Sequence, residues 1–408
     1  MQNPNGIFNT HSDDLATGGG HQHGGALHSG LNFRSAEFSL SAAYGRYLDG
    51  RLNITTDGRT IALEEAWLRG RARDSGTALK FGKFLSAVGW QNALHPHAWD
   101  FVDQPLPYQL LLAGGLGGNG AQASWEHHES SWRTKIGLEA LTGGNEAIAA
   151  LRPNPTAFTT TQGQKVSVPF GVRPDWPTIW TVFGRLAISP MAGQEWGANL
   201  GWVHGRMHQE LHQFHPGIND ADHALQGHTD TLVAGLRYAQ MTEKPTQGGW
   251  DVMAEYFYQR KDLLLNFHQT KPWNIGQPRT LNADGYYVQA RYRVTPSWTA
   301  GLRFDVTGHI QEALRDAAPN FCAPPYANLR CPRQNSQFEG ISRRSALVDW
   351  QIDTRQSLRL QISRTHSSVA LDSNLDGRME AVNQHFTQAF LQYRLALGTP
   401  PKHHRHAD

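Results

Sequence analysis

The sequence predicts an all-β protein: a transmembrane, antiparallel, up-and-down β-barrel of about 14 strands, with 16 as the alternative count. Three observations predict this fold. Apolar and polar side chains alternate along many short segments, helical periodicity is nearly absent, and short and long connections alternate along the chain. Composition agrees, because 408 residues with 41 glycines, 13 tryptophans and only 18% charged residues suit neither a disordered chain nor an ordinary helical enzyme.

Alternation of side chains is the main signal for strands. In the segment YYVQARYRV, Tyr286 and Val288 face one side, whereas Gln289 and Arg291 face the other. One face can therefore meet lipid while the other meets water, as in outer-membrane barrels. The segments that carry such a pattern are residues 37–54, 61–72, 77–86, 119–127, 131–141, 178–188, 194–206, 229–240, 249–260, 284–294, 297–309, 342–352, 357–367 and 385–397.

The lengths of the connections favour a membrane barrel over other all-β folds. Short connections such as TPS and DTRQS alternate with long ones, and transmembrane barrels combine short periplasmic turns with long extracellular loops. An even strand number would bring both ends of the chain to the short-turn side. A soluble β-sandwich or propeller is the alternative, but no blade-length repeat occurs. The long connections are residues 87–118, 142–177, 207–228, 261–283, 310–341 and 368–384.

Composition also limits the other classes of protein. No run of 18 or more apolar residues occurs, which excludes helical membrane spans. A net charge of +2 gives no reason to expect a nucleic-acid partner. Cys322 and Cys331 lie in one Pro-rich segment, FCAPPYANLRCP, which predicts a local disulfide, with two free thiols as the alternative. The first residues lack the basic start and apolar core of a signal peptide, so we expect a mature or trimmed form.

The chain divides into one barrel and two histidine-rich ends. We expect residues 1–36 to be a flexible segment, residues 37–398 to form the barrel, and residues 399–408 to form a tail. His21 and His23 lie in GGGHQHGG, a composition typical of tracts that collect metal ions.

The inward faces of the predicted strands carry mostly positive charge. Rings of charged side chains in a pore set which ions stay there, so an excess of cations predicts a channel that mildly favours anions. The alternative is that these side chains pair with acids in structural ladders across neighbouring strands. The predicted pore-lining cations are Lys80, Arg133, Lys135, Arg185, Arg237, Arg291, Arg293, Arg303, Arg359 and Arg394.

One dense histidine cluster suggests a metal site in an outer loop. In WVHGRMHQELHQFH, His204, His208 and His212 recur at intervals of four residues, and His215 follows. On a helical turn this spacing would stack imidazoles on one side, where a transition metal such as zinc could bind weakly. The alternative is a polar loop whose histidines are incidental. The stretch HGRMH lacks the glutamate of a hydrolytic zinc motif, which argues against a metalloprotease.

The connection after residue 86 is too long and too apolar to extend into water. It contains HPHAWDFVD, with His95, His97, Trp99, Asp100 and Asp103, and then YQLLLAGGLGG. A connection of this length without structure of its own is uncommon in a compact domain. We therefore expect it to fold back into the barrel mouth as a constriction. Its histidines and aspartates would be either ligands for a passing cation or hydrogen-bonding pins for the loop.

This segment also carries a resemblance to a known family. FGKFLSAVGWQNALHPHAWDFVDQPLPYQLLLAGGLGGNG, with ALEEAWLRG and the closing FLQYRLALG, resembles Gram-negative outer-membrane barrels of the zinc-regulated receptor or porin-like group, which are distantly related to phosphate-selective porins. The likeness covers about residues 31–398. It departs from the group's pattern at Gly89-Trp90, where the group has glycine-tyrosine, and in the tail after Gly398. It implies an outer-membrane protein of a Gram-negative bacterium, made under metal limitation.

Together these observations predict an outer-membrane channel for small solutes or ions that assists the uptake of zinc or another divalent metal. An anion-selective, phosphate-type porin and a surface adhesin are the alternatives. We expect no enzyme, because no nucleophile, paired carboxylates or phosphate-binding loop occurs as a motif. No cofactor is required, although zinc could bind weakly. The expected partners are outer-membrane lipid and small solutes or metal ions, with a homo-oligomer left open.

Overall fold

The computed structural model describes residues 30–72, 75–160, 163–171, 174–212, 223–240, 248–269, 275–315, 340–371 and 380–398. Several sequence predictions lie outside these ranges. They are the disulfide of Cys322 and Cys331, the metal ligands His21, His23 and His215, and the tail 399–408.

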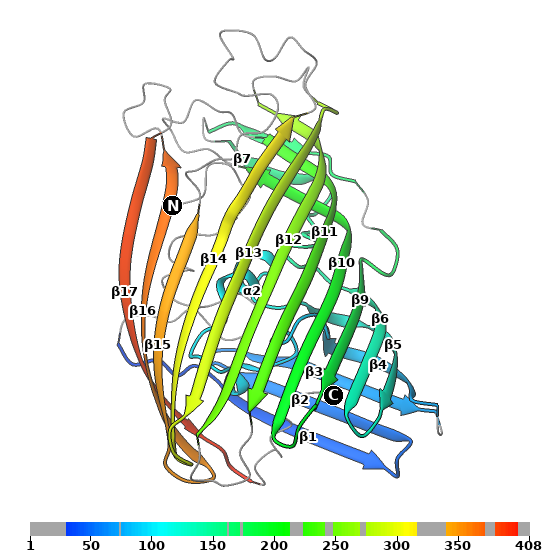
Figure 1. Cartoon of the computed structure of the whole chain (residues 1–408). Coiled ribbons are helices and arrows are strands. Elements are labelled where there is room, and N and C mark those ends of the chain that lie inside the picture. Colours follow the sequence, from blue (N-terminus) through cyan, green and yellow to red (C-terminus); the bar gives the residue numbers. More distant parts are fainter. Residues whose placement is uncertain are drawn as a thin grey trace.

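Fifteen strands form one antiparallel sheet in which neighbours in sequence are neighbours in space (Figure 1). This meander confirms the predicted all-β, up-and-down fold class. A separate hairpin of β7 (Thr156–Thr159) and β8 (Lys165–Val168) interrupts it, so β6 pairs with β9. The strands of the sheet are β1 (Ala36–Tyr44), β2 (Leu48–Thr56), β3 (Ile61–Arg71), β4 (Thr77–Leu85), β5 (Gly117–His128), β6 (Trp132–Thr142), β9 (Ile179–Ile188), β10 (Gln194–His212), β11 (His223–Gln240), β12 (Gly249–His268), β13 (Pro278–Arg293), β14 (Trp298–Arg315), β15 (Ile341–Gln351), β16 (Gln356–Leu371) and β17 (Glu380–Leu395).

The strand count differs from the predicted 14 at two places, of which one is the β7–β8 hairpin within the connection predicted at 142–177 and the other lies in the sheet itself. The segment 37–54, predicted as a single strand, is the hairpin of β1 and β2, which reverses at Gly45 with a φ of 59°. Glycine adopts such left-handed backbone at no steric cost. With an odd number of strands, β1 starts and β17 ends at opposite ends of the sheet. In the described chain these two strands are the edges of the sheet, so the closed cylinder expected from the sequence is not formed by strand pairing.

The strands β10 to β14 are longer than predicted and form the tall wall of Figure 1. β10 runs to His212 and β12 to His268, into the connections predicted at 207–228 and 261–283. Alternation simply continues there: Leu263 and Leu265 are buried on the inner face, whereas Leu264 is exposed on the outer face. Part of each predicted long loop is therefore strand.

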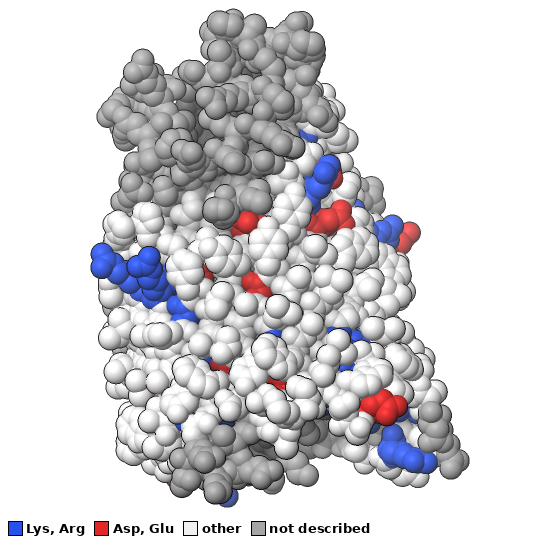
Figure 2. All heavy atoms as spheres, viewed as in Figure 1, with Lys and Arg blue, Asp and Glu red and all other residues white. Residues whose placement is uncertain are grey.

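The outer face of the sheet is apolar. Leu200, Leu236, Leu302 and Leu391 are among many large hydrophobic side chains that are exposed there. Figure 2 shows this face as mostly uncharged, with charge gathered at a few places. Aromatic pairs lie near the short turns of β10 to β15, as in the interfacial girdles of membrane barrels. They are Trp196–Tyr238, Trp250–Tyr292 and Trp298–Trp350, with ring centroids 4.6, 4.7 and 5.5 Å apart.

The inside of the sheet holds a packed apolar cluster together with many buried polar groups. Much of the cluster comes from the segment between β4 and β5, which contains the short helices η1 (Pro96–Ala98) and α2 (Leu106–Leu111). All six residues of α2 are buried, and α2 contacts β12, β13 and β14 on their inner side (Figure 1). Among the described residues, no helix is long and apolar enough to cross a membrane.

Candidate functional site

The candidate site is the segment 86–116, called the inner loop below, and the wall that surrounds it. The two ends of the inner loop lie side by side, because the Ser86 amide donates to the Leu116 carbonyl over 2.8 Å. Asn92 strengthens this closure. Its side-chain amide donates to the carbonyls of Ser86 and Leu116, and its side-chain oxygen accepts from the Leu116 amide. The loop is therefore a compact unit that its own polar groups hold together.

A buried glutamate of β6 fixes the first residues of the inner loop. Glu139 is fully buried and accepts hydrogen bonds from the Ser86 hydroxyl over 2.5 Å and from the Ala87 amide over 2.9 Å. Gln122 of β5 donates to the same carboxylate over 2.7 Å. From β9, Arg185 donates to the carbonyls of Ala87 and Gly89. The loop thus leaves β4 in a direction that the neighbouring wall determines.

A second buried carboxylate, Glu255 of β12, holds the middle of the inner loop. It accepts from the Trp90 amide and the Asn199 side chain, each over 2.8 Å, and from the hydroxyls of Tyr108 and Tyr287, each over 2.6 Å. These five residues are called the Glu255 cluster. Burial and the neighbouring carboxylate raise the pKa of Tyr108, so its hydroxyl remains a donor. All four hydrogen bonds that the buried Glu255 carboxylate accepts come from neutral donors.

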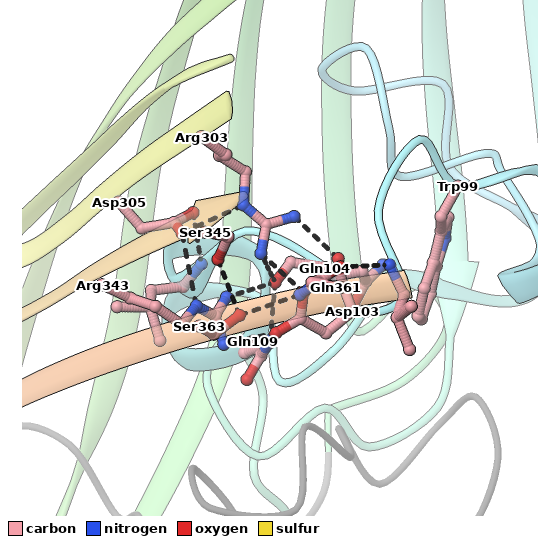
Figure 3. A network of polar contacts seen from close by, with 12 residues as sticks. Trp99, Asp103, Gln104, Gln109, Arg303, Asp305, Arg343, Ser345, Gln361 and Ser363 are labelled. Atoms are coloured by element: carbon pink, nitrogen blue, oxygen red, sulfur yellow. Dashed lines mark hydrogen bonds and ion pairs between the residues drawn. The ribbon is translucent and has the colours of Figure 1, made fainter. Parts of the chain in front are cut away.

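Charge pairing holds the next part of the inner loop, at Asp103 (Figure 3). Asp103 lies 2.7 Å from Arg303 of β14, 2.7 Å from Arg343 of β15 and 2.9 Å from the side-chain amide of Gln361 on β16. Asp305 contacts both arginines from the wall, over 3.0 and 3.3 Å. These five residues, two acids, two bases and one amide, are called the Asp103 cluster. Burial alone would raise the pKa of Asp103, but Arg343 and Arg303 outweigh it and lower the pKa to about 2.

Other inward cations also bind the inner loop. Asp100 lies 2.6 Å from Arg291 and accepts from the Gln289 side chain over 2.7 Å. Arg359 donates to the Trp99 carbonyl over 3.0 Å, and Arg394 donates to the His97 carbonyl over 2.9 Å. Asp100 and Asp103 thus make the contacts expected if they hold the loop to the wall, which was the alternative to binding a passing cation.

The ten predicted pore-lining cations all lie on the inner face, where most of them have acidic partners. The ion pairs are Arg133–Glu195, Arg237–Asp251, Arg291–Asp100, Arg303–Asp103, Arg359–Asp349 and Arg394–Asp349. Whether these residues line an open pore stays a prediction. Sequence reasoning missed Arg343, which is fully buried in the Asp103 cluster, although its alternation with the exposed Arg344 could have revealed it.

His95 occupies a pocket of acids on the wall of β3. Its Nδ1 lies 2.8 Å from Glu64 and its Nε2 lies 2.9 Å from Glu65, and its ring stacks on His97 at 6.0 Å. His97 in turn lies 2.8 Å from Glu37 of β1. Burial alone would lower the pKa of His95, but the hydrogen bonds to Glu64 and Glu65 raise it to about 9.

Three ligand atoms of this pocket are spaced for a metal ion. One atom each of Glu37, Glu64 and His95 lies within 4.8 Å of the others. An imidazole with two carboxylates is a donor set suited to zinc, and Glu65 on the second ring nitrogen could orient the imidazole. Sequence reasoning missed all three glutamates. Two adjacent glutamates on a regular strand would face opposite sides, but a bulge opposite Asn53 and Ile54 lets both reach His95.

The helical face predicted to bring His204 and His208 together is wrong. His204 and His208 lie on strand β10, and a bulge between Gly205 and His208 separates them. His204 lies on the outer face 2.9 Å from Asp230, whereas His208 is buried inside, 2.6 Å from Glu210 and 3.2 Å from Lys261. Because the two rings lie on opposite faces of the sheet, they cannot share an ion. The side chain of His212 lies outside the described part of the structure.

Comparison with known proteins gives a distant relative in sequence. No protein-family model matches the chain. An uncharacterized protein of Aquifex aeolicus (strain VF5) is 28% identical over 295 residues, which are 71% of this chain, and the match spans 57% of that relative's own length.

Solved structures with a similar course of the chain are outer-membrane proteins. OmpT of Vibrio cholerae has a TM-score of 0.48 at 8% identity, with 89% of each chain covered. OprB of Pseudomonas putida has 0.46 at 12%, with 90% of each chain covered. An anion-selective porin from Comamonas acidovorans has 0.44 at 10%, with 90% of this chain and 89% of the porin covered. These likenesses are distant, so the class of this chain rests on its own strands and surfaces.

Three features define the class of protein: the antiparallel meander, the apolar outer face with aromatic residues near the short turns, and the polar inner face. It is an outer-membrane β-barrel protein of a Gram-negative bacterium. Its inner loop packs against the inner face of the sheet.

Proposed function

We propose that the protein is a passive outer-membrane channel for small solutes or ions, whose lumen the inner loop narrows. The single observation that carries the proposal is the inner loop itself. Separate wall residues on β6, β12, β14 and β16 hold it, namely Glu139, Glu255, Arg303 and Arg359. A segment pinned at so many points acts as a fixed constriction and not as a lid. The proposal gives no residue a catalytic role.

We further propose that the channel assists the passage of zinc or another divalent cation. The site at Glu37, Glu64 and His95 supports this, since it joins two carboxylates to one imidazole at the wall. A metal ion bound to one ring nitrogen of His95 would displace the proton that this nitrogen carries in the imidazolium, so affinity should rise with pH. The HPHAWDF motif of the inner loop is also the part of the chain that most resembles the zinc-regulated group, and His95 and His97 are the histidines of that motif.

An anion-selective channel is the second candidate, and one observation favours it. Lys135 and Arg185 are directly opposite each other on β6 and β9, and Lys80 on β4 lies on the same wall. Unlike the inward arginines Arg291, Arg303 and Arg359, these three cations are not in ion pairs within the described residues. Arg185 binds carbonyls of the loop, and Lys80 lies over the rings of Trp67 and Phe84.

Conductance across a planar bilayer tests both candidates with the purified protein. A salt gradient gives the reversal potential, and zinc is then added at micromolar concentration. We expect a conducting protein whose current zinc changes, and a variant carrying Glu37→Gln and Glu64→Gln that no longer responds. Lys165→Gln, on the separate hairpin β7–β8, is the matched control.

Three outcomes would contradict the proposals separately. A folded protein that carries no current contradicts the channel. An unchanged response to zinc in the double variant contradicts the metal site. A reversal potential that favours anions, lost when Lys135 and Arg185 become glutamine, supports the second candidate instead.

A further inference from the structure

Two arginines face each other on the outer surface of the barrel. Arg344 on β15 and Arg364 on β16 are directly opposite in the antiparallel register, and both are exposed. Side chains at such positions start about 5 Å apart, and like charges there destabilise the pair. Blue spheres gather over β15 and β16 at the left of Figure 2. An anion between the two guanidinium groups would remove this repulsion.

The described outer face near these arginines offers no carboxylate. In register, Arg344 is next to Phe304 of β14, with its guanidinium carbon 5.9 Å from the ring centroid, and Arg364 is next to Thr387 of β17. One row further along, His366 and His385 stack at 4.5 Å and add two more basic groups. The nearest acids of these strands, Asp305 and Asp349, point inward and are paired there. The anion must therefore come from outside the described chain.

The depth of the patch indicates which molecule supplies the anion. Counted from the aromatic residues near the short turns, Arg344 lies six residues above Trp350, whereas the first outward charge of β12, Arg260, lies ten residues above Trp250. At about 3.3 Å per residue, these are about 20 and 33 Å along tilted strands. The apolar band of the outer face is therefore shorter along β15 and β16 than along β12. Long arginine side chains in such a place extend toward the lipid headgroups.

A comparison with the outer face of β10 to β12 argues against a second copy of the chain that would present this face as the partner. There, Arg260 pairs with Asp262 at 2.8 Å, and Asp230 binds His204 at 2.9 Å and Trp202 at 3.1 Å. These outer acids already have partners of their own. A neighbouring barrel that presented this wall would have no spare carboxylate for Arg344 and Arg364.

We propose that Arg344 and Arg364, together with His366 and His385, bind a phosphate group of an outer-leaflet lipid. A guanidinium group can hold two phosphate oxygens at once, and two such groups facing each other can share one phosphate or bind two adjacent ones. The bound lipid would cancel the repulsion within the pair and cover the low edge of the apolar band. This assignment does not depend on the channel function, because neither arginine faces the inside of the barrel.

Lipid binding by the purified, detergent-solubilised protein tests the proposal. Native mass spectrometry would follow the binding of diphosphoryl lipid A, with diacylglycerol as the neutral lipid and inorganic phosphate as the free anion. The test variant combines Arg344→Gln and Arg364→Gln. Arg293→Gln, the same change on the inner face near a short turn, is the control. Heat-dependent migration on gels verifies that each variant is folded.

We expect the wild type and the control to bind lipid A, and the double variant to bind it at least tenfold more weakly while its conductance stays unchanged. Equal affinities in all three proteins would overturn the proposal. Inorganic phosphate bound as tightly as lipid A would assign the patch to a free anion and overturn it too. So would an oligomer that separates in the double variant, because a second copy would then be the occupant.

Discussion

The inner loop is held by two buried carboxylates that are satisfied in opposite ways. Glu255 comes from the wall and accepts only neutral donors, two of them from the loop itself. Asp103 comes from the loop and meets two arginines of the wall. The Glu255 cluster adjoins the apolar side of the interior, whereas the Asp103 cluster lies among the paired charges of β14 to β16. One part of the loop is thus fixed by directed hydrogen bonds and the other by charge.

The largest effect is expected where charge holds the loop. Asp103→Ala leaves Arg303 and Arg343 buried with only Asp305 between them. Removing one partner of a buried ion-paired group typically costs about 3–5 kcal/mol. Urea unfolding of the protein in lipid vesicles should show a loss of this size, and Glu129→Ala, in an exposed turn, should show almost none. A loss below 1 kcal/mol for Asp103→Ala would mean that charge does not anchor this part of the loop.

A smaller loss is expected where neutral donors hold the loop. Glu255→Gln keeps the shape of the side chain but replaces one accepting oxygen by an NH₂ group that faces the hydroxyls or the Trp90 amide. An unsatisfied buried group costs about 1–3 kcal/mol. The same unfolding experiment measures it. If Glu255→Gln destabilises more than Asp103→Ala, the order of the two anchors is reversed.

His95 is a third residue that holds the inner loop, and the pH dependence of stability tests whether its contribution depends on its positive charge. Its pKa is raised from 6.5 to about 9, so its contribution is fully present below pH 6.5 and is lost as the pH rises through 9. Within that window the loss is at most about 1.4 kcal/mol per pH unit. Unfolding midpoints between pH 6 and 9.5 should fall in the wild type and fall less in His95→Gln. Parallel curves for the two proteins would exclude His95 as the titrating group.

The smallest effect is expected at the partly exposed rim of the loop. Arg394→Gln removes the hydrogen bonds to the His97 carbonyl and the Ser357 hydroxyl and one of the two ion pairs of Asp349, while Arg359 still pairs with that carboxylate. Water can replace these contacts at the partly exposed rim, so the loss in urea unfolding should be about 1 kcal/mol, the typical net contribution of one hydrogen bond. A loss as large as that of Asp103→Ala would show that this contact belongs to the charge-held anchor.

The alternation of apolar and polar residues predicted most of the strands of the wall, because successive side chains of a strand point to opposite faces of the sheet. It identified the inward arginines Arg291, Arg303 and Arg359 without knowledge of their partners. It could not predict the partners themselves, since Asp103 and Arg303 lie 200 residues apart and meet only through the fold of the whole sheet.

The errors share one physical origin, local departures from a regular strand. A turn at Gly45 divided one predicted strand into two. A bulge after Gly205 sent His204 and His208 to opposite faces, and another brought Glu64 and Glu65 to the same histidine. A bulge changes which face a residue occupies without leaving a mark in the residue pattern. The helical face expected for His204 and His208 is a strand instead, and the glutamates near His95 were missed.

His97 touches both edges of the sheet at once. Its carbonyl accepts from Arg394 of β17, and its imidazole lies 2.8 Å from Glu37 of β1, so a residue from the middle of one connection joins strands that are more than 300 positions apart in the chain. Contacts of such long sequence separation form late, because they require closure of a very large loop. During biogenesis the segment after β4 must therefore be in place before β17 arrives, because His97 then links β1 and β17, the two edges of the described sheet, which do not pair with each other.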